Sequence, residues 1–226
     1  MTVVDVGALK SIVANRGKSG RSITAIAGPP GAGKSTLAEE LAEALNADEP
    51  GSAAVFPMDG YHYDDLVLVP RGLRPRKGAP ETFDVAGFAH MLGRLRENSD
   101  REVAVPVFDR SIEIARAGAR MIPREVRHLI VEGNYILLDI GDWKLLHRHY
   151  DTTVMIDVPE DALRERLSER WKDLDAAAFA FKMEENDMPN GRLVRTGSIT
   201  PEFVVQQGRG NNEGHPGQDG LHACEI

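Results

Sequence analysis

The chain has 226 residues, of which 27 are Lys or Arg and 35 are Asp or Glu, so its formal net charge is −8. This acidic balance argues against nucleic acid as the main partner, because proteins that bind the phosphate backbone usually present a basic surface. The single cysteine, Cys224, excludes an intramolecular disulfide and a cysteine-based metal cluster. With no membrane-length apolar run and no signal peptide, we expect a cytoplasmic protein without a membrane partner.

The first predicted elements are a helix, a strand and a second helix. Apolar spacing predicts a short helix over residues 6–16, with Asp5 as its N-cap. The apolar, β-branched run at 22–28 predicts a buried strand, and a second helical pattern spans 34–45. Strand, glycine-rich turn and helix therefore follow one another directly.

A second strand, predicted over residues 53–58, brings Asp59 to its end. The stretch 60–84 that follows is rich in proline, glycine and arginine, which at this length is typical of a binding loop. This stretch contains a basic cluster that could hold a phosphorylated acceptor or lie in an ordinary solvated loop. The cluster consists of Arg71, Arg74, Arg76 and Lys77.

The second half of the chain continues the alternation of strands and helices, which indicates βαβ units. The predicted fold class is therefore α/β, with a parallel sheet flanked by helices. Residues 1–205 are predicted to form one domain. Residues 206–226, with five glycines and few large apolar side chains, are predicted to be a disordered tail. The elements predicted here are a helix over 85–98, an edge strand interrupted by Pro106 over 103–108, strands over 127–133 and 153–158, and a helix over 160–171.

The glycine-rich turn reads GPPGAGKST over residues 28–36 and matches the pattern G-x-x-x-x-G-K-[ST] in full. Glycine tolerates positive φ, so such a turn can point successive backbone N–H groups at phosphate oxygens. Because Pro29 and Pro30 lack an N–H, the donors are expected to begin at Gly31. Lys34 is expected at the β- and γ-phosphates of ATP, and Ser35 at Mg²⁺. The predicted nucleotide-binding residues of this turn are Gly31, Ala32, Gly33, Lys34, Ser35 and Thr36.

Several classes of nucleotide-binding protein lack support in this sequence. The Asn/Thr-Lys-x-Asp guanine reader of regulatory GTPases and the Leu-Ser-Gly-Gly-Gln signature of transporter ATPases are both missing. Small-molecule phosphotransfer is then the leading class.

A family resemblance supports this class. The segments GPPGAGKST, PMDGYHYDD, PVFDRSIE, LIVEGNYIL, LRERLSERW and ENDMPNGRLV together resemble the phosphoribulokinase/uridine kinase family of P-loop kinases. More narrowly, they resemble its bacterial branch labelled nucleoside/nucleotide kinase-like or fructose-transport-system kinase. The resemblance covers about residues 8–205. It implies a P-loop NTPase fold with an arginine-bearing lid, ATP with Mg²⁺, and a small hydroxyl-bearing acceptor.

Two carboxylates are predicted at the ends of buried strands, where open α/β sheets assemble their ligands. Asp59 matches the family's acceptor-site aspartate, which implies that it accepts a hydrogen bond from the acceptor hydroxyl and takes its proton. Glu132 ends the central strand, where a buried carboxylate is costly unless it faces an ion, so we assign it to Mg²⁺ or its waters. The alternatives are a turn aspartate and a structural hydrogen-bond acceptor.

Three arginines, Arg164, Arg166 and Arg170, lie on the helix predicted over 160–171, where the resemblance places a lid. Arg166 and Arg170 are four residues apart, so they share a face on which guanidinium groups can grip phosphoryl oxygens. Kinases of this family use such a helix as a lid that closes over ATP and excludes water. Glu165 and Glu169 interleave with them, and a solvated, ion-paired face is the alternative.

The acceptor is expected to be read by residues near Asp59. Asp109 and Arg110 lie where the resembling enzymes recognise their acceptor, and a carboxylate beside a guanidinium can bind the hydroxyls of a polyol. Alternatively these two residues pair with each other or cap a turn. Tyr61 and His62 are expected to line the same pocket.

The resemblance also places Asn186 and Asn190 in a loop near the adenine, where amide side chains suit a purine edge. The predicted function is an ATP-dependent kinase that transfers the γ-phosphate to a hydroxyl of a sugar or nucleoside-like metabolite. The residues predicted to be catalytic are Lys34, Asp59, Arg166 and Arg170. The alternative is a regulatory ATPase that acts on a protein partner, and a homodimer is left open.

Overall fold

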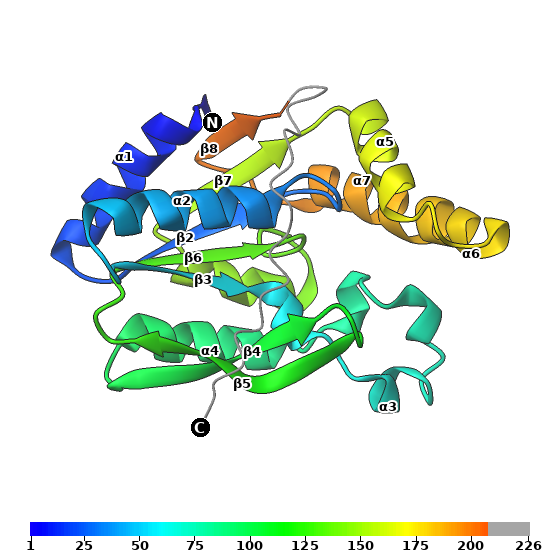
Figure 1. The fold of residues 1–226 in the computed structure, drawn as a ribbon, viewed down its shortest axis with the longest axis horizontal. Helices are drawn as coiled ribbons and strands as arrows, with labels where there is room; N and C mark the ends of the chain where they lie inside the picture. The colour runs from blue at the N-terminus through cyan, green and yellow to red at the C-terminus, as the bar shows by residue number, and fades with distance from the viewer. Residues whose placement is uncertain (208–226) are drawn as a thin grey trace.

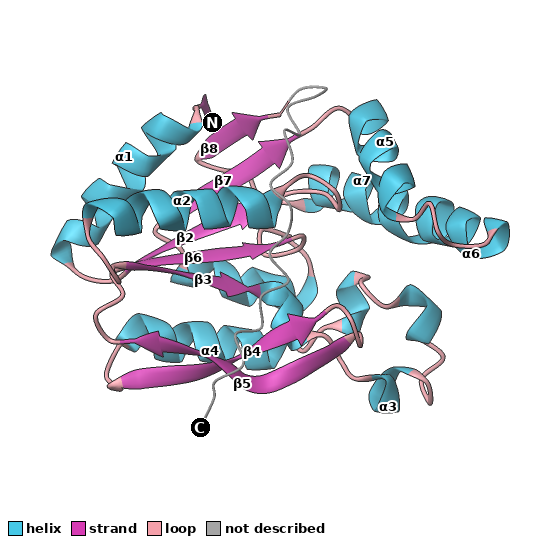
Figure 2. Ribbon diagram, viewed as in Figure 1, coloured by secondary structure: helices cyan, strands magenta, loops and turns pink. Residues whose placement is uncertain are grey.

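The computed structural model describes residues 1–207 of the chain. Its main sheet has the strand order β1-β8-β7-β2-β6-β3, and every pair of neighbouring strands is parallel (Figures 1 and 2). This arrangement confirms the predicted α/β class. The strands of this sheet are β1 (Thr2–Val3), β2 (Ser22–Ala27), β3 (Ala53–Pro57), β6 (His128–Gly133), β7 (Thr152–Asp157) and β8 (Phe203–Gln206).

Helices cover both faces of the main sheet, and each face has its own buried apolar cluster. One cluster includes Leu41 and the other includes Phe88. Because both faces are covered, β2 and β6 are buried along their whole length. The covering segments are α1 (Val6–Arg16) and α2 (Lys34–Asp48) on one face, with α4 (Val85–Glu97) and the 3₁₀ segment η5 (Gly141–His149) on the other.

Local hydrogen bonds explain why these helices begin and end as predicted. The carboxylate of Asp5 accepts the N–H of Ala8 at 2.7 Å and caps α1 as expected. Asp84 caps α4 in the same way by accepting the N–H of Gly87 at 2.9 Å. The helix α4 ends at Glu97 and is followed by Asn98, whose left-handed conformation (φ of 52°) is a common way to terminate a helix.

The edge strand predicted over 103–108 is β4 (Glu102–Asp109), but it does not join the main sheet. It pairs antiparallel with β5 (Ile114–Pro123), which was not predicted, in a separate two-stranded sheet. The register shifts around Pro106, which has no N–H to donate. The hairpin packs tightly on the turn after β3: a Cβ on Gly60 would lie 2.5 Å from the carbonyl oxygen of Pro106.

The stretch 60–84 is built from short turns rather than from one irregular loop. Backbone hydrogen bonds join its two ends, from Tyr63 N to Thr82 O and from Asp84 N to Tyr61 O, both at 2.9 Å. We call this stretch the acceptor loop. Its elements are η2 (Met58–Tyr61, which begins just before it), α3 (Asp65–Leu68), η3 (Arg74–Arg76) and η4 (Pro80–Thr82).

The helix predicted over 160–171 is α5, and it opens a helical arm that extends beyond the sheet (Figure 1). The arm corrects one prediction, because Asn186 and Asn190 lie in helical segments and not in a loop. The arm consists of α5 (Glu160–Arg170), α6 (Ala176–Ala180), the π-helical segment η6 (Phe181–Asp187) and α7 (Met188–Gly197).

The described chain continues past the predicted domain boundary at residue 205. Gln206 ends β8, and the backbone N–H of Gln207 donates to Asp157 O at 3.0 Å. The rest of the predicted tail, residues 208–226, lies outside the described residues. Among residues 1–207, none of the helices combines the length and apolarity needed to cross a bilayer.

Candidate active site

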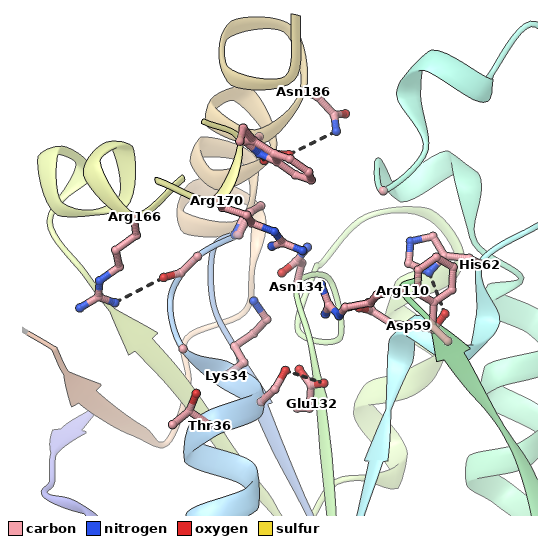
Figure 3. Close-up of a pocket in the computed structure, with 18 of the residues that line it drawn as sticks. Lys34, Thr36, Asp59, His62, Arg110, Glu132, Asn134, Arg166, Arg170 and Asn186 are labelled. Atoms are coloured by element: carbon pink, nitrogen blue, oxygen red, sulfur yellow. Dashed lines mark hydrogen bonds and ion pairs between the residues drawn. The ribbon is translucent and has the colours of Figure 1, made fainter. Parts of the chain in front are cut away.

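A cavity of about 930 Å³ opens at the carboxyl ends of the parallel strands (Figure 3). It lies beside β2, whose neighbours β6 and β7 come from later parts of the chain. At such a position the connections from neighbouring strands run to opposite sides of the sheet. Open α/β sheets bind their ligands in the crevice that this reversal leaves at the carboxyl ends of the strands. The acceptor loop, the β4–β5 hairpin and the helical arm complete its walls.

The turn between β2 and α2 has the geometry of a phosphate-binding loop. Gly31 and Gly33 have φ values of +78° and +84°, a region that favours glycine. The N–H of Ala32 donates to Pro29 O at 3.1 Å, so Ala32 closes the turn and does not line the cavity, contrary to its predicted role. The other predicted residues of this turn do line the cavity: Gly31, Gly33, Lys34, Ser35 and Thr36.

Lys34 is buried, and its Nζ donates to Pro29 O at 2.9 Å. Burial lowers the pKa of Lys34 to about 8, although the negative charges of Glu132 and Asp59 oppose this shift. A bound polyphosphate would raise this pKa again, since anions stabilise an ammonium group. The helix α2 begins at Lys34 and adds its partial positive charge at the same place.

Ser35 and Glu132 form an oxygen pair beside the phosphate-binding loop. The hydroxyl of Ser35 donates to Glu132 Oε1 at 3.2 Å, and Glu132 is only 5% exposed. Burial and the charge of Asp59 raise the pKa of Glu132. A hydroxyl and a buried carboxylate are ligands that Mg²⁺ accepts in combination with phosphate oxygens and water, so the pair fits this ion. Within the described chain, no three acidic, His or Cys residues gather into a self-contained metal site.

Asp59, His62 and Arg110 come together at the opposite end of the cavity (Figure 3). Asp59 accepts a hydrogen bond from Arg110 Nη2 at 3.1 Å, so the hairpin supplies the guanidinium and the turn after β3 supplies the carboxylate. The imidazole of His62 lies between the rings of Phe83 and Phe108, with ring centroids 4.1 and 4.5 Å away. These three predicted acceptor residues therefore share one subsite.

Two other predicted acceptor residues do not line the cavity. Tyr61 packs against the core residues Phe56 and Phe88, with ring centroids 5.9 and 4.9 Å away, and its hydroxyl is buried. Successive residues of the turn point in different directions, so Tyr61 faces inward where His62 faces the cavity. Asp109 instead accepts the backbone N–H and the hydroxyl of Ser111, which is the turn-capping alternative.

Two of the three predicted lid arginines, Arg166 and Arg170, line the cavity. Arg166 Nη1 donates to Gly31 O at 3.3 Å and to Gln207 Oε1 at 3.2 Å. Burial and the nearby charge of Arg110 lower the pKa of Arg170. Arg164 instead forms an ion pair with Glu184 outside the cavity. Arg166 thus contacts the phosphate-binding loop, whereas the charges that act on Arg170 are those of Arg110, Asp187 and Asp59.

Asn186 and Asn190 were predicted to lie near the adenine, and their observed positions do not support this role. Asn190 is buried and donates to Asn186 Oδ1 at 3.1 Å, and it does not line the cavity. Asn186 does line it, but on the side of Gly78 in the acceptor loop and away from Thr36 (Figure 3). The part of the cavity near the start of α2 and the end of β8 is lined by Val6, Glu40, Gln206 and Gln207.

Several cavity residues were not predicted from the sequence. Asn134 follows Glu132 by two positions, so the rule that sites form at strand ends could have identified it. The indole N–H of Trp171 donates to Asp187 Oδ2 at 2.8 Å, an interaction that depends on how the arm folds back. Of the predicted basic cluster, Lys77 lines the cavity, while Arg71, Arg74 and Arg76 do not. The unpredicted residues on the acceptor side and the arm are Glu113, Asn134, Trp171, Lys182 and Asp187.

The lid arginines face both the phosphate-binding loop and a second subsite that has its own carboxylate. A protein that only holds a nucleotide has no need of this second subsite. The phosphate-binding loop and the subsite of Asp59 together define the protein as a P-loop kinase. A family model described as an AAA domain matches residues 25–187.

Several of the similar relatives carry kinase names. A provisionally named uridine kinase, C227.14 of Schizosaccharomyces pombe, is 34% identical over 197 residues, covering 83% of each chain. YggC of Escherichia coli K12, described as uncharacterized, is 38% identical over 194 residues, covering 82% of this chain and 78% of YggC. The crystal structure of a provisionally named fructose transport system kinase from Silicibacter sp. TM1040 is 40% identical, with a TM-score of 0.79, covering 89% of this chain and 98% of that one. The chain belongs to the phosphoribulokinase/uridine kinase family of P-loop kinases and is a phosphotransferase.

Proposed function

We propose that this kinase transfers the γ-phosphoryl group of ATP to a hydroxyl of a sugar- or nucleoside-like metabolite, with Mg²⁺ as the metal. The observation that carries the proposal is the position of Asp59, which shares a cavity with Lys34 but lies in the subsite formed with Arg110. The relatives' names support both acceptor classes, since one is named for uridine and another for fructose transport.

The nucleotide side of the cavity would hold the polyphosphate. The backbone N–H groups that begin at Gly31 and the ammonium group of Lys34 would bind the phosphate oxygens, while Ser35 and Glu132 would hold Mg²⁺ and its waters. When bound, Mg²⁺ supplies positive charge to the β- and γ-phosphate oxygens. Most of the rate enhancement would then come from positioning and from fixed positive charge.

The acceptor side would present the attacking hydroxyl. Its oxygen forms a bond to the γ-phosphorus while the bond from phosphorus to the bridging oxygen breaks and ADP leaves. Asp59 would accept the hydrogen bond of this hydroxyl and take its proton late in the transfer. Arg166 and Arg170 would stabilise the charge on the transferred group, and the arm that carries them would exclude water.

The test is ADP release by the full chain over a panel of ketoses, aldoses, polyols, nucleosides and pantothenate. The kinase proposal predicts slow hydrolysis of ATP alone and strong stimulation by one class of alcohol. Turnover of ATP that no alcohol changes, but that a protein partner stimulates, would instead support a regulatory ATPase and overturn the proposal.

A further inference from the structure

The side chain of His62 offers a hydrogen-bond acceptor to the cavity. Its Nδ1 lies 2.7 Å from the carbonyl oxygen of Asp59. A carbonyl can only accept, so Nδ1 must carry the proton, and in the neutral ring Nε2 then has a lone pair. Burial lowers the pKa of His62, which favours the neutral ring at neutral pH. Within residues 1–207, Nε2 has no hydrogen-bond partner, and the residue lines the cavity.

Two hydrogen-bond acceptors therefore stand close together on one short turn. The carboxylate of Asp59 and Nε2 of His62 come from positions three residues apart, and both lie at the same end of the cavity (Figure 3). Each can bind a group that donates a hydrogen. A single hydroxyl has one hydrogen, so filling both positions takes two hydroxyl groups on one molecule.

The aromatic side chains around Asp59 do not offer a free face to a flat ring. The imidazole of His62 already lies between Phe83 and Phe108. Phe83 also makes edge contacts with Tyr135 and Trp143, and the ammonium group of Lys77 lies 5.7 Å from the centre of the Phe108 ring. Recognition of a nucleobase usually draws on stacking against an exposed aromatic face, and the described residues of this subsite lack one.

On the acceptor loop and the hairpin, the carboxylates and cations that line this subsite are equal in number. The carboxylates are Asp59 and Glu113, and the cations are Lys77 and Arg110, while the nearby Arg170 of the arm is the residue proposed to hold the transferred phosphoryl group. Lys77 is buried and donates to Asp65 Oδ1 and to the carbonyl of Glu113, both at 2.7 Å, while Arg110 pairs with Asp59. A phosphate group brings up to two negative charges and would need cations that are not already committed to carboxylates. The subsite thus fits an uncharged molecule better than a phosphorylated one.

We infer that the acceptor is an unphosphorylated sugar or polyol, and that two of its neighbouring hydroxyl groups contact Asp59 and Nε2 of His62. This inference rests on the proposed function, because it assigns the reacting hydroxyl to Asp59. It selects sugars over nucleosides as the acceptor class, and it makes His62 a residue that determines acceptor specificity.

The first experiment uses the unmodified chain and compares kcat/KM for matched acceptors. We expect a sugar or polyol to exceed its deoxy analogue, which lacks the hydroxyl next to the phosphorylated one, by at least about tenfold. Nucleosides and sugar phosphates should be poorer acceptors than the preferred sugar. A nucleoside or a sugar phosphate as the best acceptor would overturn the inference and leave the proposed function intact. Failure of every alcohol to stimulate turnover would overturn the proposed function itself.

A second experiment tests the assignment of His62. The variant His62→Ala should lower kcat/KM for the sugar by about tenfold but should change it less than about twofold for the deoxy analogue, which already lacks the partner hydroxyl. The conservative variant His62→Gln keeps an accepting oxygen and should recover part of the loss. ATP binding by both variants checks that they are folded. Equal losses on both acceptors would mean that His62 only packs against Phe83 and Phe108, and the inference would fall.

Discussion

The nucleotide side and the acceptor side of the cavity are built in different ways. On the nucleotide side, the phosphate-binding loop comes from one run of nine residues, 28–36, and relies on backbone N–H groups and a helix terminus. The acceptor side takes side chains from separate segments: Asp59 after β3, Lys77 in the acceptor loop, Arg110 in the hairpin and Asn134 after β6. The phosphate-binding loop tolerates little change at its glycines of positive φ, whereas a site built from separate side chains can change its ligand by single substitutions.

The largest effect is expected on the nucleotide side. Replacing Lys34 by alanine removes a buried cation that would bind the phosphates in both the ground state and the transition state. We expect Lys34→Ala to reduce turnover by at least about 1000-fold and to weaken ATP binding as well. Steady-state kinetics and calorimetric titration with ATP measure the two quantities.

A matched control separates this role from a general loss of charge. Lys10 lies on α1 and pairs with Asp48 at 2.8 Å, away from the cavity. The variant Lys10→Ala should retain turnover within about twofold, since exposed ion pairs contribute little. If Lys34→Ala behaved like Lys10→Ala, the phosphate-binding role of Lys34 would be wrong.

The acceptor side should respond differently to the loss of its carboxylate. We expect Asp59→Asn to lower the rate of transfer by about 100-fold to 1000-fold, because the amide cannot take a proton. Since Asp59 lies in the acceptor subsite, ATP affinity should stay within about threefold of the unmodified chain. Single-turnover transfer and ATP titration, run on the same preparation, separate the two effects.

The control for this substitution is Asp109→Asn, a carboxylate on the same hairpin as Arg110 that caps a turn outside the cavity. Its transfer rate should remain close to that of the unmodified chain. Near-normal transfer by Asp59→Asn, or an equal defect in Asp109→Asn, would remove the distinction between the two sides of the cavity.

The same contrast explains which parts of the structure could be predicted from the sequence. The phosphate-binding loop, α1, α2 and the central strands follow from local spacing, because their packing repeats with the period of a helix or a buried strand. Glu132 and Asp59 were predictable because strand ends meet at one edge of a parallel sheet.

Other features depend on contacts that no local pattern encodes. Tyr61 and His62 are neighbours in the sequence, but only the packing of Tyr61 against Phe88 decides which of them faces the cavity. Asp109 turns to Ser111, and β5 forms because β4 needs a partner outside the main sheet. Asn186 reaches the cavity through the π-helical register of η6, and wide helical turns of this kind are rare and often occur at functional sites.

A smaller effect is expected on the pH dependence of ATP affinity, which tests the nucleotide side alone. The pKa of Lys34 is lowered to about 8 in the ligand-free protein, and a bound polyphosphate favours the charged amine and raises it. The contribution of Lys34 to ATP affinity should therefore be constant below about pH 8. Above that value it should fall, by up to about tenfold per pH unit, until the pKa of the complex is reached. Titration with ATP in the absence of acceptor, between about pH 6.5 and 9.5, measures this slope.

An arginine at position 34 provides the control, since a guanidinium stays protonated over this range. We expect Lys34→Arg to bind ATP with a changed affinity but without the loss above pH 8. A persistent slope in Lys34→Arg would assign the pH dependence to another group. Acceptor KM values should not follow this titration, because Lys34 belongs to the nucleotide side.

The smallest effect concerns a contact that joins the acceptor loop to the lid. Arg76 Nη1 donates to the carbonyl oxygen of Glu185 in η6 at 2.6 Å, and its Nε approaches Glu81 Oε1 at 3.4 Å. We expect Arg76→Ala to raise the acceptor KM by about threefold to tenfold, the value of about one hydrogen bond, with ATP affinity unchanged. The matched control is Arg71→Ala, whose guanidinium lies over the ring of Tyr63 in the acceptor loop, 5.5 Å from its centre. If the two variants raise the acceptor KM equally, the loop needs both arginines only for its own structure. A rise confined to Arg76→Ala would mean that the acceptor side, though assembled from separate segments, is held in place by the arm that we propose to act as a lid.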